Sequence, residues 1–147
     1  MIFLSGLPSK IEKDGFALVH GSPRQPSWEY VLSLSIAREN FTCFTTLFCL
    51  TGHTHVPAAY MRKSSTVSAV TLSENVGLAL GDIPMMLNPG SVGQPCDSDP
   101  RASYAIYDSQ VGIFRLHRVP YNIAFVRDRI CGYGLPVRLA SRLEPGV

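Results

Sequence analysis

Leu47-Phe48-Cys49-Leu50-Thr51-Gly52-His53-Thr54-His55 is a short apolar run that ends at a polar, glycine-containing segment with two histidines. The run predicts a buried strand that stops at Thr51-Gly52. Upstream, Phe16-Ala17-Leu18-Val19 predicts a second buried strand, which ends at His20-Gly21-Ser22-Pro23. Between the two strands, residues 28–40 have a mostly helical spacing behind Ser27, a candidate N-cap. Strand, loop, helix and strand in this order begin an α/β unit.

The remainder of the chain is richer in strands. Short apolar or alternating runs are separated by Gly, Asn, Asp and Pro, as in hairpins. The tail predicts two short helices on either side of Gly132-Tyr133-Gly134. We therefore predict one α/β (α+β) domain over residues 1–147. The expected strands are 66–72, 77–80, 83–87, 103–107 and 112–118, and the expected helices lie within 121–143.

Composition excludes several classes of protein. Only 16% of the 147 residues are charged and 46% are hydrophobic, which excludes disorder. The net charge of +2 comes from scattered basic residues, and this argues against nucleic-acid binding. No apolar run approaches the ~20 residues of a membrane-spanning helix. Residues 1–4 lack the basic region of a secretory signal. Four cysteines without a CxxC pair suggest reduced thiols, so we expect a cytoplasmic protein: Cys43, Cys49, Cys96 and Cys131.

Three of the four histidines lie where the first two strands end. His20 follows one strand, and His53 and His55 follow the next. Strand ends in α/β sheets collect functional sites, and neutral imidazole is a common metal ligand. If Gly52 to His55 is extended, His53 and His55 point to one side, roughly 6.5–7 Å apart. That spacing suits a pair of metal ions better than one ion. The alternative is that each is an ordinary histidine at a strand end.

Three segments, Leu18–Arg24, Thr51–Pro57 and Asn88–Pro95, together resemble a known family. They read LVHGSPR, TGHTHVP and NPGSVGQP, and they are similar to the second half of calcineurin-like metallophosphoesterases of the small bacterial phosphodiesterase and phosphatase type. Residues 99–104 and 134–136 also fit, so the resemblance covers nearly the whole chain. It implies part of a four-layer α/β/β/α sandwich whose N-terminal strands are missing. It also implies a site for two divalent ions, Mn, Fe or Zn.

The same resemblance implies roles for individual residues. His20 and His53 would ligate the second metal of the family's site and His55 the first. A water or hydroxide bridging the metals would attack phosphorus in line, in a phosphoester small molecule or a phosphoprotein. Arg24 lies four residues after His20 and is a candidate for binding the substrate phosphate; a solvated surface arginine is the alternative. Cys96 stands where the family's GQPRD motif has an arginine.

The family's other motifs, DxH, GDxxD and GNH[DE], are absent from the sequence before His20. Gly81-Asp82-Ile83-Pro84 lacks the second aspartate and is interpreted as a turn between strands. No catalytic residue of the family is therefore expected in this chain, and the three histidines hold at most one ion. We expect an N-terminally truncated phosphomonoester or phosphodiester hydrolase, inactive alone, whose partner is the missing N-terminal half. The alternatives are a catalytically inactive scaffold or binding protein of the same fold, and a fragment with no role.

Overall fold

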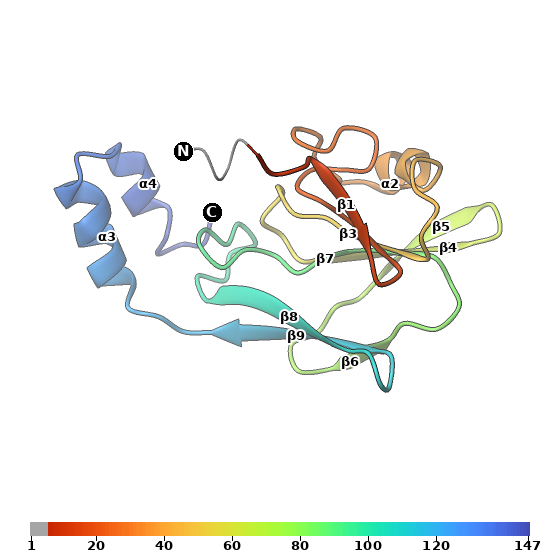
Figure 1. Cartoon of the computed structure of the whole chain (residues 1–147). Helices are drawn as coiled ribbons and strands as arrows, with labels where there is room; N and C mark the ends of the chain where they lie inside the picture. Colours follow the sequence, from red (N-terminus) through yellow and green to blue (C-terminus); the bar gives the residue numbers. More distant parts are fainter. Residues whose placement is uncertain (1–5) are drawn as a thin grey trace. The chain divides into compact units, whose positions relative to one another are not determined.

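A computed structural model describes residues 6–147, and the chain folds as two compact units (Figure 1). The first unit contains the chain up to Thr54, together with Ala58–Thr71 and Leu80–Asn88. The second unit contains His55–Pro57, Leu72–Ala79 and Pro89–Val147. Residues 1–4, for which the sequence predicts no secretory signal, lie outside the described residues. Within residues 6–147, no helix is both long enough and apolar enough to cross a membrane.

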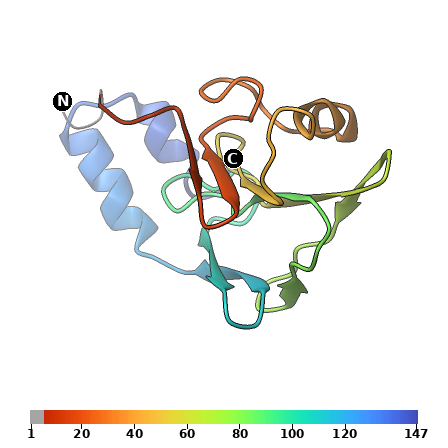
Figure 2. The same ribbon diagram turned by 45° about the vertical axis from the view of Figure 1, so that its right-hand side comes forward.

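The first unit is built on a six-stranded mixed sheet with the strand order β1-β2-β3-β7-β4-β5. The three neighbouring strands β2, β3 and β7 are parallel, and all other pairings are antiparallel. Figure 2 shows the β1–β2 hairpin in red and the β4–β5 hairpin in yellow-green. Because β2, β3 and β7 are parallel, their carboxyl ends lie at the same edge of the sheet. The strands are β1 Lys10–Lys13, β2 Phe16–Val19, β3 Phe48–Leu50, β4 Ala58–Lys63, β5 Thr66–Val70 and β7 Met85–Asn88.

Helix α2 covers Leu34–Asn40 and packs against β4 and β5. It begins at Ser33, whose Oγ accepts a hydrogen bond from the Ile36 N–H at 3.3 Å. The prediction of a helix from residue 28, capped by Ser27, is therefore wrong in its first part. Residues 21–29 instead form turns, in which Ser22 Oγ accepts from the Gln25 N–H at 3.0 Å, and such local side-chain bonds to the backbone compete with a helix.

Sequence reasoning also missed two strands of this sheet. β1, with the sequence Lys-Ile-Glu-Lys, is a charged edge strand that the sequence alone does not distinguish from a loop. β4 is identified as a strand only in the structure, where it pairs with β5 on one side and β7 on the other. The predicted strands around residues 16–19, 47–50, 66–72 and 83–87 are confirmed within a few residues.

The core of the first unit lies where the sheet meets α2 and the segment before it. Cys49 is fully buried there, and burial raises the pKa of its thiol to about 12, so this cysteine is an inert core residue. Cys131, in contrast, is exposed. The core residues are Ala17, Val31, Ala37, Phe41, Phe44, Cys49, Val67 and Met86.

The second unit contains a three-stranded antiparallel sheet followed by two helices, as the sequence predicts. Its strand order is β6-β9-β8, and α3 and α4 pack on each other. Phe114 and Leu116 of β9 are buried, and the side chain of Arg118, near the end of β9, is only 6% exposed and pairs with Asp97. The elements are β6 Gly77–Ala79, β8 Ala102–Asp108, β9 Ile113–Val119, α3 Ile123–Gly132 and α4 Val137–Ser141.

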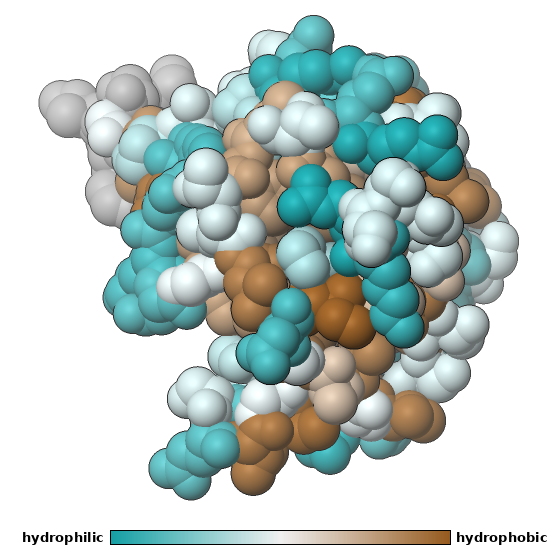
Figure 3. All heavy atoms as spheres, turned by 90° about the vertical axis from the view of Figure 1, so that its right-hand side faces the viewer, coloured by the Kyte–Doolittle hydropathy of each residue, from teal (hydrophilic) through white to brown (hydrophobic). Residues whose placement is uncertain are grey.

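Many large apolar side chains of the described residues lie on the surface. Figure 3 shows one face on which apolar residues lie among polar ones. This agrees with the low charged fraction of the sequence. Several large apolar side chains are at least 60% exposed, among them Trp28, Leu32, Val76, Val92, Val111, Tyr133 and Val137.

Candidate metal centre

The segments that follow β2 and β3, and the last residue of β7, carry the polar side chains of the candidate site. His20 follows β2, His53 lies three residues after β3, and Asn88 ends β7. These strands are adjacent and parallel, so their carboxyl ends meet at the same edge of the sheet. This is the edge at which α/β sheets bind ligands. The sequence pattern and the topology therefore point to the same place in the first unit.

The backbone at His53 is a tight turn and not an extended strand. The Thr54 N–H donates to the Gly52 carbonyl at 2.7 Å, and φ of His53 is 62°. A three-residue turn with a positive φ at its centre is the rare and strained form. His55 also has a positive φ, of 59°. The expected 6.5–7 Å spacing between His53 and His55 assumed an extended segment, and that assumption is wrong.

Asn88 holds this strained turn in place. Its side chain is buried, and Nδ2 donates to the Gly52 carbonyl and to Thr54 Oγ1, both at 2.8 Å. The Gly52 N–H donates in turn to the His20 carbonyl at 2.9 Å. A Cβ on Gly52 would approach that carbonyl to 3.3 Å, so glycine allows the two histidine segments to lie this close. Strained residues that neighbours hold in place are typical of functional sites.

His20 and His53 meet through their ring nitrogens. His53 Nδ1 lies 2.9 Å from His20 Nε2, and the rings are edge-on with centroids 4.8 Å apart. Two imidazole nitrogens bound to one zinc ion at about 2.0–2.1 Å in tetrahedral geometry would be roughly 3.3 Å apart. The pair therefore fits two ligands of a single ion after a small movement. His20 is exposed and His53 is half-buried, so a ligand can reach both rings.

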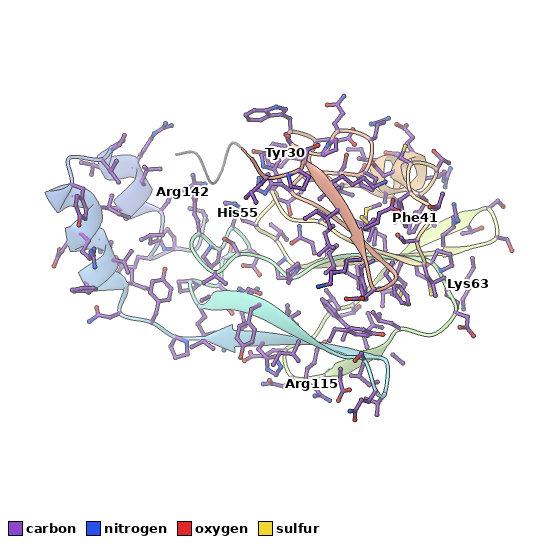
Figure 4. The ribbon with its side chains drawn as sticks, viewed as in Figure 1. Tyr30, Phe41, His55, Lys63, Arg115 and Arg142 are labelled. Carbon is purple, nitrogen blue, oxygen red and sulfur yellow. The ribbon has the colours of Figure 1, made fainter. Side chains whose placement is uncertain are left out.

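His55 belongs to the second unit and has different neighbours there. The Cys96 N–H donates to the His55 carbonyl at 3.2 Å, and Cys96 Sγ lies 3.8 Å from His55 Nδ1. Arg142 Nη2 lies 3.8 Å from the same sulfur (Figure 4, where His55 and Arg142 are labelled). The structure thus pairs His20 with His53, and it pairs His55 with Cys96.

The fit to a complete metal site is partial. Across the part of the chain that the structure describes, no group of three or more His, Cys, Asp or Glu side chains is arranged to hold a metal ion. Two neutral imidazoles also lack the anionic ligands that Mn²⁺ and Fe²⁺ favour. The His20–His53 pair is therefore half of a site at most.

Arg24 is held by two carboxylates. Its Nη1 donates to Glu39 and its Nη2 to Glu29, and these contacts raise the pKa of the guanidinium. Glu29 also accepts hydrogen bonds from Ser22 Oγ at 2.6 Å and Asn40 Nδ2 at 2.7 Å. This network lowers the pKa of the Glu29 carboxyl to about 2, chiefly through Arg24. Arg24 thus fixes the loop after His20, and its contact with substrate stays a prediction.

The sequence pattern predicts no role at the candidate site for Glu29, Asn40 or Asn88. All three are largely buried polar residues in the first unit, and each has hydrogen-bond partners that a local pattern does not show. Asn88 was visible only as the first residue of the NPGSVGQP motif. Its partners, Gly52 and Thr54, are 36 and 34 residues away in the sequence.

Comparison with known proteins places this arrangement in a family. The profile of the calcineurin-like phosphoesterase superfamily domain matches residues 6–112, which include His20, His53, His55 and Asn88. The chain belongs to this superfamily. The crystal structure of a metallophosphoesterase from Sphaerobacter thermophilus superposes with a TM-score of 0.94 at 39% sequence identity, over 99% of this chain and 61% of that one. The expected α/β fold, as part of a metallophosphoesterase, is therefore confirmed.

Two further similarities extend the comparison to archaea. An uncharacterised protein of Methanocaldococcus jannaschii is 32% identical over 98% of this chain and 58% of its own length. A hypothetical protein from Pyrococcus horikoshii has the same fold, with a TM-score of 0.71 at 21% identity over 99% of this chain and 54% of that one. This calcineurin-like chain thus spans little more than half the length of the relatives it matches.

Proposed function

We propose that this chain supplies the histidine edge of a metal-dependent phosphoesterase, a hydrolase of phosphomonoesters or phosphodiesters. The observation that carries the proposal is the approach of His20 Nε2 to within 2.9 Å of His53 Nδ1 at the carboxyl ends of β2 and β3. Membership of the calcineurin-like superfamily, whose members typically bind divalent metals, supports it. His20, His53 and His55 are the proposed ligands.

Each proposed residue has a definite task in such a site. His20 and His53 bring two ring nitrogens within hydrogen-bond distance of each other, and the turn that Asn88 holds keeps the His53 ring there. Divalent ions, when bound, supply positive charge that polarises phosphoryl oxygens and lowers the pKa of water. His55 is held by its backbone and side-chain contacts with Cys96. Fixing ligands before binding lowers the cost of ordering them afterwards.

The carboxylates and the acid–base histidine of the family's site would come from residues outside this chain. The relatives are longer, and the chain covers 58% to 61% of two of them. The described residues offer two converging imidazoles and no third ligand beside them. We therefore propose that the chain alone turns over phosphoesters poorly or not at all. It would gain activity when the family's N-terminal motifs are supplied.

A second candidate function is a scaffold or binding protein with the metallophosphoesterase fold. The observation that favours it is the lack of a three-ligand group among residues 6–147. Inspection of the DNA upstream of the Met1 codon separates the two candidates. Codons for DxH, GDxxD and GNH[DE], in frame or frameshifted, support the truncated enzyme. Their absence supports the scaffold, or a fragment with no role.

Metal binding and turnover by the purified chain test the proposal directly. We expect calorimetric titration with Zn²⁺ to show at most one ion bound, with affinity at least tenfold weaker in His20→Ala and in His53→Ala. His117→Ala is the matched control, since His117 lies in β9 of the second unit. With added Mn²⁺, we expect no hydrolysis of bis(p-nitrophenyl) phosphate. Clear turnover that disappears in His53→Ala would contradict the proposal that the chain alone is inactive. Unchanged Zn²⁺ affinity in both His20→Ala and His53→Ala would contradict the proposal that these histidines bind the metal.

A further inference from the structure

Two exposed aromatic side chains lie against His53 in the first unit. The Tyr30 ring is tilted 30° to the His53 ring with centroids 4.1 Å apart, and the Trp28 ring meets it edge-on at 6.4 Å. Trp28 is 79% exposed and Tyr30 is 50% exposed. Figure 4 labels Tyr30 on the segment between β2 and α2. These two rings are not core residues, and His53 is the residue that they share.

The segment that carries the two rings is firmly fixed. The Ser22 side chain is fully buried and donates to Glu29, and Asn40 donates to the same carboxylate oxygen. A Cβ on Gly21 would lie 2.9 to 3.1 Å from backbone atoms of Gln25, Trp28 and Glu29, so only glycine allows the loop to close this tightly. The exposure of Trp28 is therefore built into a rigid loop. A preorganised aromatic surface binds a ligand at a low entropic cost.

The neighbours of the rings indicate what they could hold. His53 and His20 bring polar ring nitrogens together, and the aromatic rings of Trp28 and Tyr30 lie beside His53. A ligand that carries a phosphate and a planar ring can place the phosphate at the histidines and the ring on the aromatics. Stacking of a base on an aromatic side chain contributes about 1–3 kcal/mol and tolerates different bases, because each has a π face.

We propose that Trp28 and Tyr30 form a stacking subsite for the planar ring of the phosphoester substrate, and that this substrate is a nucleotide or an aryl phosphoester. The subsite rests on the proposed function, because it takes the His20–His53 edge as the phosphate end. It goes beyond that function in naming the substrate class. It also assigns Tyr30 a binding role that the sequence did not suggest.

Trp28 is the single tryptophan of the chain, so its fluorescence reports on this subsite alone. The 147-residue chain is titrated with adenosine 5′-monophosphate in EDTA, with ribose 5-phosphate as the ligand without a ring. We expect saturable quenching by the nucleotide, with a Kd on the order of 1 mM or tighter, and none by the sugar phosphate. Because neither metal nor turnover is needed, a failed hydrolysis assay leaves this result standing.

Three variants make the test specific. Tyr30→Leu should weaken nucleotide binding at least about fivefold, the fold-change that one weak stacking contact supplies. Tyr30→Phe keeps the ring and should bind as the unaltered chain does. Tyr104→Leu is the matched control, because Tyr104 stacks on His117 in the second unit. Circular dichroism confirms that each variant is folded.

Four results would overturn the subsite. The first is equal quenching by ribose 5-phosphate, and the second is quenching that never saturates. The third is an affinity that Tyr30→Leu leaves unchanged in a folded variant. The fourth is a Trp28 emission maximum that shifts on dilution, because that would show a second copy of the chain covering the rings.

Discussion

Two histidine–tyrosine pairs in this chain look alike in composition and differ in their surroundings. His53 and Tyr30 lie with ring centroids 4.1 Å apart in the first unit, and His117 and Tyr104 lie 5.2 Å apart in the second. His117 and Tyr104 are directly opposite each other on β9 and β8. His53 instead lies in a strained turn, and its ring meets a second histidine.

The difference shows which features distinguish a candidate site from an ordinary contact. A cross-strand pair such as Tyr104–His117 is a regular unit of sheet stabilisation and requires no further explanation. A positive φ at a non-glycine residue costs free energy locally, and at His53 it persists because a buried amide holds the turn. Residue type alone does not separate these two cases; the backbone and the partners do.

The largest expected effect comes from removing the side chain that holds the His53 turn. Asn88→Ala leaves the Gly52 carbonyl and Thr54 Oγ1 without these donors in a buried place, and we expect a loss of about 2–3 kcal/mol in the free energy of unfolding. Asn75→Gly, which removes the hydrogen bond to His117 and suits the positive φ there, should change it by less than about 0.5 kcal/mol. Urea denaturation measures both. Equal losses of free energy of unfolding in Asn88→Ala and Asn75→Gly would show that Asn88 stabilises the fold no more than Asn75 does.

The next effect concerns the carboxylate that fixes the Tyr30 loop. Glu29→Gln should lower the free energy of unfolding at pH 7 by about 1–3 kcal/mol, since Glu29 accepts charge-assisted hydrogen bonds. The Glu29 pKa falls from 4.5 to about 2 on folding, so its stabilisation is complete above pH 4.5 and is lost as the pH falls toward 2. Denaturation at several pH values should show that the difference in free energy of unfolding between the unaltered chain and Glu29→Gln shrinks as the pH falls from 4.5 toward 2. Glu144→Gln, at an exposed ion pair, is the control and should have almost no effect. A difference independent of pH would contradict the role given to Glu29.

A third comparison predicts opposite signs for one substitution. His53→Gly removes the strain of φ 62°, so the free energy of unfolding should stay the same or rise by up to about 1 kcal/mol. His117→Gly places glycine in the middle of β9 and should lower it by about 1 kcal/mol or more. Thermal unfolding followed by circular dichroism measures both. A clear loss of stability in His53→Gly would contradict the expected sign and would show that the ring contacts of His53 with His20 and Tyr30 outweigh the strain of the turn.

The smallest effect separates binding from stability at the two tyrosines. Tyr104→Leu removes a cross-strand aromatic pair and should lower the free energy of unfolding by about 0.2–1 kcal/mol. Tyr30→Leu changes a half-exposed residue in a loop and should lower it by less than about 0.5 kcal/mol. The two values come from the same urea titrations. A larger loss for Tyr30→Leu than for Tyr104→Leu would assign Tyr30 a structural role.

The local pattern of the sequence predicts most strands and both C-terminal helices, because burial periodicity and turn residues act over a few positions. It fails where distant residues decide the local structure. Residues 28–32 have a helical spacing, but the turn in which Trp28 and Glu29 donate to the Gln25 carbonyl does not continue as a helix, and the Glu29 carboxylate instead accepts from Asn40. Strand β4 likewise depends on its partners β5 and β7.

The family and the chemical types at the site can be predicted from the sequence, since the motifs around His20, His53 and Asn88 are continuous in the chain. How those residues meet depends on the three-dimensional fold. The positive φ of His53, its approach to His20 and its contact with Tyr30 depend on parallel strands that bring distant segments to one edge of the sheet. Long-range pairing fixes these contacts, and a local pattern carries no information about it.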